Sequence, residues 1–395
     1  MQEADPSVAA TRAPRWWAPI LAGYREPNCG RSTVELIITS VPFVVLWVLM
    51  WAALGTGYWV GLLLALPAAG FLVRLFMIQH DCGHGSFFRR RRTNDWVGRV
   101  IGVLTLTPYD FWRHSHALHH ANSGNLDHRG FGDVDTLTVR EFLALSRWRQ
   151  FMYRLYRNPI VMFGIGPMYL FVLQHRLPAG LTRSSWHFWL STMATNLAIA
   201  VLAATMIWLV GLGAFLLVQV PITLLAGSIG VWLFYIQHQF EDTFWARGDG
   251  WNFHDAALHG SSHYDLPSVL RWFTANIGVH HVHHLCSRIP YYRLQQVLLD
   301  HPELAAVGRL TLRESFQCVK HGSLGRKEAS AYFLSRDAYS QVGSEQKGRR
   351  GTKSSVVIAS LGGDAKKERQ NDVDNCIDRC VDHATRDDPV VDTAM

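Results

Sequence analysis

Long stretches of this chain lack charge. From Ser184 to Phe240 there is no Asp, Glu, Lys or Arg, although the 395 residues include 38 basic and 31 acidic side chains. A stretch of this length without charge can hold two membrane-spanning helices joined by a turn near Gly211. We expect these helices at about residues 186–210 and 214–236.

Two earlier apolar runs, at about residues 36–54 and 58–78, are joined by the uncharged turn Gly55-Thr56-Gly57. The second run contains Arg74 near its end, where a long side chain can extend to the membrane interface. The run at 160–173 is apolar but too short to span comfortably, which predicts an interfacial or packed segment. Apolar residues at helical spacing predict a surface helix at 93–106.

Other absences exclude other classes of protein. The N-terminus lacks the short apolar core and cleavage site of a secretory signal. The six cysteines show no paired framework, which favours a reduced, cytosol-facing protein. We find no flavin or dinucleotide fingerprint and no fused haem domain, so electrons for a redox reaction must come from another protein. After Tyr339 there is no aromatic residue, and residues 341–395 predict a disordered charged tail.

The excess of basic residues gives a formal net charge of +7. Such a balance can indicate nucleic acid or an anionic membrane surface as a partner. Here the arginines flank apolar runs, which favours the membrane and no nucleic acid. The segment after the second run carries fourteen arginines, and the turns at the far ends of both helix pairs carry none. The positive-inside rule places that segment, both termini and the histidine clusters described next in the cytosol.

We therefore predict an all-α integral membrane protein, with four transmembrane helices in two hairpins and a folded cytosolic helical cap. The predicted organisation is a cytosolic N-terminal segment at residues 1–33, one domain at 34–340 and the tail at 341–395.

Histidines occur in three clusters. The first, His80-Asp81-Cys82-Gly83-His84, lies where the second span ends. The second and third share the spacing HxxHH. Residues three and four apart share one face of a helix, so each cluster can direct two or three imidazoles at one point. With one histidine at the end of the fourth span there are nine candidate ligands: His80, His84, His116, His119, His120, His238, His280, His283 and His284.

Nine imidazoles are more than one metal ion can bind, and they suffice for two metals with four or five each. A site rich in neutral nitrogen and poor in carboxylates suits redox iron that activates oxygen, whereas zinc takes three or four ligands. Asp81, Asp110 and Glu241 lie close in sequence to these histidines and are candidates to orient the rings by hydrogen bonds. The remaining nearby histidines receive no ligand role: His114, His281, His254, His259 and His263.

The sequence resembles the membrane-bound fatty acid desaturase family, and most of all bacterial acyl-lipid desaturases of the Δ12 or Δ5 type. The resembling segments are HDCGHGSF at 80–87, WRHSHALHHANSGNLD at 112–127, and about 233–294, which includes LFYIQHQFEDTFW, GSSHYDLP and NIGVHHVHHLCSRIPYYRL. The resemblance implies a four-helix stem with a cytosolic cap, and two iron ions held by the nine histidines.

The resemblance also implies a reaction. Oxygen and two electrons remove two hydrogens from adjacent methylenes of an acyl chain and leave a cis double bond, in a Δ12/omega-6-like position. Ferredoxin is the implied electron donor, ahead of cytochrome b5, and the implied location is a bacterial inner membrane. Animal acyl-CoA desaturases carry an Asn one turn before the equivalent of His238. Here that residue is Phe234, which favours lipid-linked acyl chains over acyl-CoA.

Three other functions are compatible with parts of the pattern. A diiron hydroxylase or ketolase would share the clusters and the topology, and its product would gain an oxygen atom. A divalent-metal transporter would place ionisable ligands near the bilayer midplane, where the last two spans have no acidic residue. A structural membrane protein leaves the repeated histidine spacing unexplained.

Overall fold

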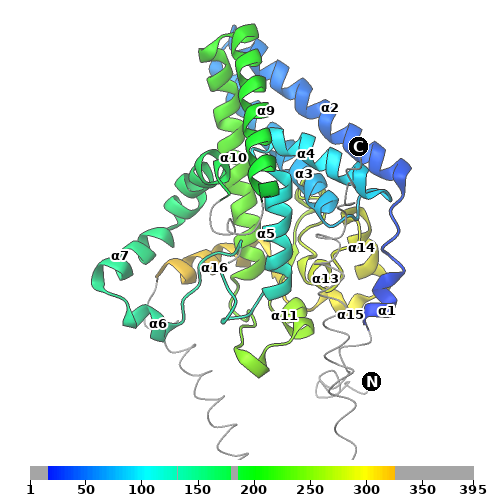
Figure 1. Ribbon diagram of the computed structural model, residues 1–395, viewed down its shortest axis with the longest axis vertical. Coiled ribbons are helices and arrows are strands. Elements are labelled where there is room, and N and C mark those ends of the chain that lie inside the picture. The colour runs from blue at the N-terminus through cyan, green and yellow to red at the C-terminus, as the bar shows by residue number, and fades with distance from the viewer. Residues whose placement is uncertain (1–16, 131, 179–185, 325–395) are drawn as a thin grey trace, which may run out of the picture.

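The computed structural model describes residues 17–130, 132–178 and 186–324 (Figure 1). These residues are mainly helical, and the tail predicted at 341–395 lies outside them. The elements in chain order are α1 (Trp17–Ala22), α2 (Cys29–Ala53), α3 (Tyr58–Gly83), α4 (Arg91–Leu104), α5 (Tyr109–Asn122), α6 (Val139–Ala144), α7 (Arg147–Tyr156), η3 (Val161–Ile165), α8 (Gly166–Met168), η4 (Tyr169–Leu173), η5 (Gln174–Arg176), α9 (Trp186–Val210), α10 (Leu212–His238), η6 (Gly248–Gly250), α11 (Phe253–His259), β1 (His263–Asp265), α12 (Ser268–Phe273), α13 (His280–Leu285), α14 (Tyr291–Asp300), α15 (Pro302–Ala305), β2 (Arg309–Thr311) and α16 (Leu312–Leu324).

Four of these helices, α2, α3, α9 and α10, are long and apolar enough to cross a membrane. They coincide with the four predicted spans, and the helix predicted at 93–106 is α4. Three spans, α2, α3 and α10, are longer than predicted. α2 begins at Cys29, after the side chain of Asn28 caps its first turn, and α3 continues to Gly83, so that His80 lies on the helix itself. Gly211 separates α9 from α10 with φ of 86°, a conformation that glycine adopts without strain.

The long helices form a stem with a wide apolar surface. α3 packs against both α2 and α10, and α9 lies along α10 (Figure 1). In the most apolar window of α9 only 6% of the residues are buried. Exposed apolar side chains on this scale are expected where lipid, rather than water, is the surrounding solvent.

Arg74 does not extend to an interface as the sequence analysis expected. Its side chain is buried and forms an ion pair with Glu35 of α2. Its guanidinium also donates to the carbonyl of Trp272 and to the hydroxyl of Thr39. A buried arginine requires such partners, and the pair joins α2 to α3 inside the stem.

The cap lies at the end of the stem where α3 and α10 finish, and includes α11, α13, α14 and α15 (Figure 1). It departs from the all-α prediction in one respect. β1 and β2 form a short parallel pair in the register His263↔Arg309, Tyr264↔Leu310 and Asp265↔Thr311. The backbone of Tyr264 also donates to the carbonyl of Gly278, just before α13. The strands therefore fix the approach to the third histidine cluster.

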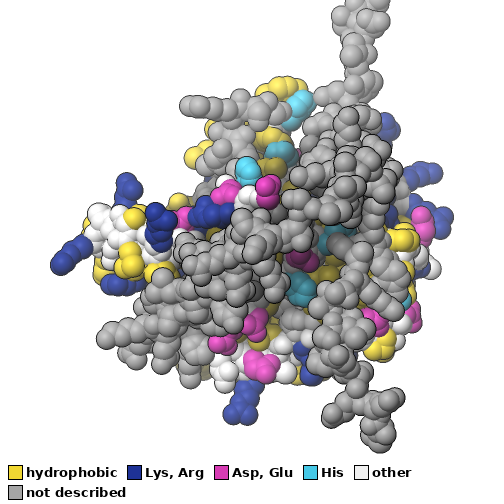
Figure 2. Space-filling model, turned by 90° about the horizontal axis from the view of Figure 1, so that it is seen from below, with side chains coloured by type: hydrophobic (Ala, Val, Ile, Leu, Met, Phe, Trp, Pro, Cys, Tyr) yellow, Lys and Arg dark blue, Asp and Glu magenta, His cyan; other side chains and the backbone are white. Residues whose placement is uncertain are grey.

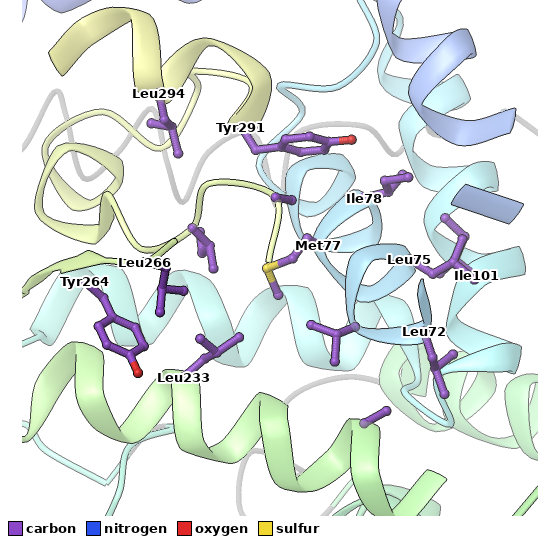
Figure 3. Packing of buried hydrophobic residues seen from close by; sticks show 14 of the residues in the cluster. Leu72, Leu75, Met77, Ile78, Ile101, Leu233, Tyr264, Leu266, Tyr291 and Leu294 are labelled. Atoms are coloured by element: carbon purple, nitrogen blue, oxygen red, sulfur yellow. The ribbon is translucent and has the colours of Figure 1, made fainter. Parts of the chain in front are cut away.

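One hydrophobic core connects stem and cap. Leu72 and Ile78 of α3 and Leu233 of α10 are buried in the same cluster as Tyr264 and Leu294 of the cap. Figure 3 shows these side chains between α3, α10 and the cap segments. Because the core is continuous, the ends of α3 and α10 are held in fixed positions relative to α13.

Candidate metal centre

The nine predicted histidines come from four helices. His80 lies in the last turn of α3, and His84 is the residue that ends this helix. His238 is the last residue of α10. The second cluster lies on α5, which begins after Pro108, and the third lies on the short helix α13. All three clusters are therefore helical or at a helix end, as their spacing predicted.

The structure gathers these side chains into two groups. One contains His80, His84, His116, His120 and His283, and the other contains His119, His238, His280 and His284. In each group, one nitrogen from every ring lies within 4.8 Å of all the others. The groups are adjacent, because the rings of His120 and His284 stack with centroids 4.1 Å apart. The numbers, five and four, are those expected for two metal ions.

Each cluster directs two imidazoles at one group, as predicted, but the second and third clusters each direct their remaining histidine at the other group. In the second cluster His116 and His120 join the five-membered group, while His119 joins the other. In the third cluster His280 and His284 belong to the four-membered group, whereas His283 belongs to the five-membered group. Successive residues on a helix differ in direction by about 100°, so positions i+3 and i+4 diverge and can serve two centres on either side of one helix.

The distances between ring nitrogens fit a shared cation. In the five-membered group the Nε2 atoms of His84, His116, His120 and His283 are consecutively 3.1, 3.1 and 3.2 Å apart. In the other group the consecutive distances are 3.1, 3.0 and 3.1 Å, along His119, His238, His280 and His284. Two nitrogens bound at right angles to one metal at about 2.1 Å would lie about 3.0 Å apart.

Hydrogen bonds between the rings explain this arrangement less well. A ring nitrogen holds either one proton or one lone pair, never both. The Nε2 atom of His116 has two such neighbours, and so does that of His238. One proton or one lone pair makes a single good hydrogen bond. Hydrogen bonds among the rings alone therefore cannot satisfy every nitrogen in these two rows of contacts. Lone pairs that converge on a metal satisfy every nitrogen at once.

The surroundings keep five of the rings neutral. His119, His280, His283 and His284 are at most 3% exposed. Burial, together with neighbouring imidazoles, holds the pKa of the five α5 and α13 histidines His116, His120, His280, His283 and His284 well below its usual value. A neutral imidazole offers its lone pair without first losing a proton, which is the state that metal binding requires.

Three groups lie beside the Nδ1 atoms of the rings, where they can fix the ring orientation. Asp81 lies 3.4 Å from Nδ1 of His80 and also accepts a bond of 2.7 Å from the backbone of Tyr291. His238 Nδ1 donates to the carbonyl of Gly260 at 3.2 Å. His119 Nδ1 donates to Asp133. A bond to one nitrogen fixes which tautomer leaves the other free for a metal.

Asp133 was missed by the sequence analysis. It lies in the loop between α5 and α6, which folds back along α5. Gly132 beside it, with φ of 73°, approaches the side chain of Ser115, where a Cβ atom would lie 3.3 Å from Oγ. No spacing of residues in the sequence predicts that this loop returns to α5. The pair of His119 and Asp133 is therefore identified only by the path of the loop in the structure.

The other two acidic candidates lie elsewhere. Both carboxylate oxygens of Asp110 accept bonds from Arg99, and one also accepts from Ser191. Asp110 thus joins α4, α5 and α9. Glu241 is exposed in the turn after α10, and within the described residues no hydrogen bond joins it to a histidine. Proximity in sequence was misleading because Asp110 bonds to α4 and α9 and Glu241 lies in an exposed turn beyond the end of α10.

The histidines without a predicted ligand role stay outside both groups. His281 is buried on the other side of α13 and donates to the carbonyl of Leu304 at 2.9 Å. His263 donates to the carbonyl of Ala305 at 2.7 Å, and the ring of His114 packs on Phe188. His254 and His259 lie on α11.

Phe234 lies directly beside the four-membered group. Its ring centroid is 5.2 Å from that of His119 and 5.2 Å from that of His238. A phenyl ring offers no ligand atom and no hydrogen bond, so this side of the group is covered by an apolar surface.

Comparison with known proteins gives consistent results. The family model described as fatty acid desaturase matches residues 56–315. A Bacillus subtilis (strain 168) protein named "Fatty acid desaturase" is 47% identical over 297 residues, covering 75% of this chain and 84% of the relative. A Synechocystis sp. protein named "sn-1 acyl-lipid omega-3 desaturase (ferredoxin)" is 31% identical over 238 residues, covering 56% of this chain and 62% of its own. A Vigna radiata protein named "Omega-3 fatty acid desaturase, endoplasmic reticulum" is 29% identical over 272 residues, covering 63% of this chain and 62% of the relative.

Proposed function

This chain belongs to the fatty acid desaturase family of oxidoreductases, and on that premise we propose that it is a membrane-bound acyl-lipid desaturase with a diiron centre. The proposed reaction removes one hydrogen from each of two adjacent methylenes and forms a cis double bond. One O2, two electrons and two further protons are consumed, and two waters are formed.

The observation that carries the proposal is the pair of buried imidazole groups. The nine histidines of the two groups would hold the two iron ions, five on one and four on the other. An all-nitrogen ligand set suits redox iron, whose chemistry when bound is the reductive activation of O2 for attack on an unactivated C–H bond.

The protein's own groups would prepare this centre in three ways. The carboxylates of Asp81 and Asp133 and the carbonyl of Gly260 hold the rings in one orientation. Burial keeps most of the rings away from water, which limits side reactions. The helices α3 and α10 carry histidines of the two groups at their ends, which places the proposed centre where the candidate spans meet the cap.

Lipid-linked acyl chains are the proposed substrate. Phe234 supplies no polar contact beside His238, unlike the Asn of the animal acyl-CoA enzymes. Three relatives carry "acyl-lipid" and "(ferredoxin)" in their names, which supports a lipid substrate and ferredoxin as the donor. The sequence motifs favour Δ12-like regiochemistry, whereas the names of several relatives indicate omega-3 specificity for those proteins. The two regiochemistries can be distinguished by the acyl chain that is supplied as substrate.

The proposed setting is a bacterial inner membrane with the cap and both termini in the cytosol. The charge distribution supports this orientation, since the segment between α3 and α9 carries many arginines and the turns at Gly55 and Gly211 carry none. The cap would then meet a soluble electron donor in the cytosol.

The deciding experiment expresses the chain in a bacterium that lacks desaturases but contains a ferredoxin system. Monoenoic and dienoic acyl chains are supplied in separate cultures, and fatty-acid methyl esters are analysed for each lipid class. A diene formed from the monoene supports the Δ12-like assignment, and a triene formed from the diene supports omega-3 specificity. The inactive control is the His283→Ala protein at equal expression.

Two outcomes would overturn the proposal. A hydroxylated or keto product would assign the chain to the sister chemistry at the same metal centre. An unchanged acyl profile in every lipid class, with iron bound to the purified protein, would remove membrane acyl lipids as the substrate.

A further inference from the structure

Helix α7 (Arg147–Tyr156) projects from the body at the end of the stem where the cap begins, on the left in Figure 1. None of its residues is buried. It is held by two tyrosines, since Tyr153 and Tyr156 bond to the backbone of Asp135 and Leu137. A helix attached by one face only leaves a long unpartnered surface.

The unpartnered surface is an apolar stripe. Trp148, Phe151, Met152 and Leu155 are spaced at i, i+3, i+4 and i+7, so they share one face of the helix. They are between 41% and 67% exposed. This face lies opposite the side that carries Tyr153 and Gln150, whose bonds attach α7 to the loops beside it. The stripe is therefore directed away from the protein.

The charge beside the stripe is entirely positive. α7 contains Arg147, Arg149 and Arg154 and no acidic residue. Among the described residues no ion pair includes any of the three. Figure 2 shows basic and apolar side chains next to one another on this projection, at the left. Arginines beside exposed Trp, Phe and Leu are typical of a helix that lies in the interface of an anionic membrane.

The segment that follows α7 lies beside a surface expected to meet lipid. Immediately after α7, Arg157 bonds to Gln239 at 3.1 Å, at the end of the candidate span α10. The chain then runs along α10, where Pro167 approaches Gly227 closely. Ile160, Ile165 and Tyr169 of this stretch are exposed, so apolar side chains are exposed both on α7 and on the segment that leads to the stem.

We infer that α7 is a membrane-surface anchor that binds anionic phospholipid, with Trp148, Phe151, Met152 and Leu155 inserted among the headgroups and its arginines on phosphate. The inference goes beyond the proposed reaction and does not depend on it. An acidic soluble protein is the competing occupant, and it is disfavoured because the segment that follows α7 packs along the candidate span α10 and exposes further apolar side chains.

A photo-crosslinking experiment on the full-length protein tests this inference. Phe151→p-benzoylphenylalanine places a reactive group on the stripe, and Gln150→p-benzoylphenylalanine places it on the opposite face of the same helix. Both proteins are placed in nanodiscs of phosphatidylcholine alone and of phosphatidylcholine with phosphatidylglycerol. After illumination, adducts are identified by intact mass.

We expect lipid adducts at position 151, several-fold fewer at 150, and an excess of phosphatidylglycerol adducts over that lipid's share of the bilayer. Replacing the three arginines by Gln should remove this excess while phosphatidylcholine adducts persist. The inference is overturned if position 151 gives no lipid adduct, if both positions react equally, or if illumination of whole cells attaches position 151 to a protein. The readout is independent of desaturation, so its failure is distinguishable from failure of the proposed function.

Discussion

Single side chains decide how the two imidazole groups are held. The ring nitrogens that face inward are interchangeable in chemistry, but the groups behind them differ. His119 is backed by a carboxylate, His238 by a backbone carbonyl, and His80 by a neighbouring carboxylate at a longer distance. Such partners fix ring orientation and are expected to matter nearly as much as the ligands.

Asp133 is the most informative of these partners. We predict that Asp133→Ala lowers metal affinity by about 10–100-fold, because His119 loses the acceptor that fixes its tautomer. Iron content after dialysis against a graded chelator series measures the effect. Asp133→Asn, which keeps an acceptor oxygen, should lie between. The control is Asp135→Asn, two residues along the same loop and exposed; an equal loss in both variants would contradict the assignment.

Two histidines of α13, separated by one residue, provide a second contrast. His283 points into the five-membered group, whereas His281 bonds to Leu304 on the opposite side. We predict that His283→Ala abolishes activity and reduces bound iron. His281→Ala should retain iron and lose about 1–3 kcal/mol of stability, because the buried carbonyl of Leu304 is left without its partner. Iron analysis and thermal unfolding distinguish the two, and equal iron content in both variants would refute the ligand assignment.

At the scale of elements, close approaches between helices set the positions of the clusters. Tyr109 opens α5 and is fully buried, and its hydroxyl donates to the carbonyl of Cys82 at 2.9 Å. It thereby links the helix of the second cluster to the end of α3. This packing needs Gly98 of α4, where a Cβ atom would lie 2.2 Å from the tyrosine ring.

We therefore predict that Gly98→Ala is destabilising by about 1–3 kcal/mol, because the ring of Tyr109 must move. Activity should fall as well, since α5 moves with its ligands. Thermal unfolding in detergent measures the first effect. The matched control is Gly230→Ala on α10, where an added Cβ meets no atom within 4 Å. Similar unfolding temperatures for the two variants would show that the contact is not tight.

The ion pair between α2 and α3 is the second element-scale feature. Arg74→Met leaves Glu35 buried with only Arg31 as an ionic partner, and we predict a loss of about 3–5 kcal/mol. The double variant Glu35→Met/Arg74→Met removes both charges and should recover most of the loss. The unfolding temperatures of the single and double variants measure the loss of stability and its recovery. A double variant no more stable than the single one would mean that the charges themselves stabilise the stem.

For the whole molecule, the proposed metals would act as crosslinks. The proposed ligands come from four separate helices, α3, α5, α10 and α13. We predict that removing metal with a chelator lowers the unfolding temperature and that restoring iron raises it. Each site contributes about 2.7 kcal/mol when free metal exceeds its dissociation constant 100-fold. His283→Ala should show a smaller shift, and an identical shift in this variant would place the metal elsewhere.

The sequence by itself determined the four long helices and the nine histidines that are candidates for the centre. Uncharged length is sufficient to define the four long helices, and the HxxHH spacing is sufficient to place imidazoles on helices. These signals are local, because hydropathy and helical period depend only on residues near one another in the chain.

Tertiary structure decided how the histidines are shared and what supports them. His119 and His283 each belong to a different group from the other histidines of their clusters. This division depends on the angles at which α5 and α13 meet the ends of α3 and α10. The partnership of Asp133 with His119 depends on the path of a loop, and the burial of Arg74 depends on Glu35 from another helix. All three are contacts between distant segments, whose geometry is fixed by packing and leaves no period or motif in the sequence.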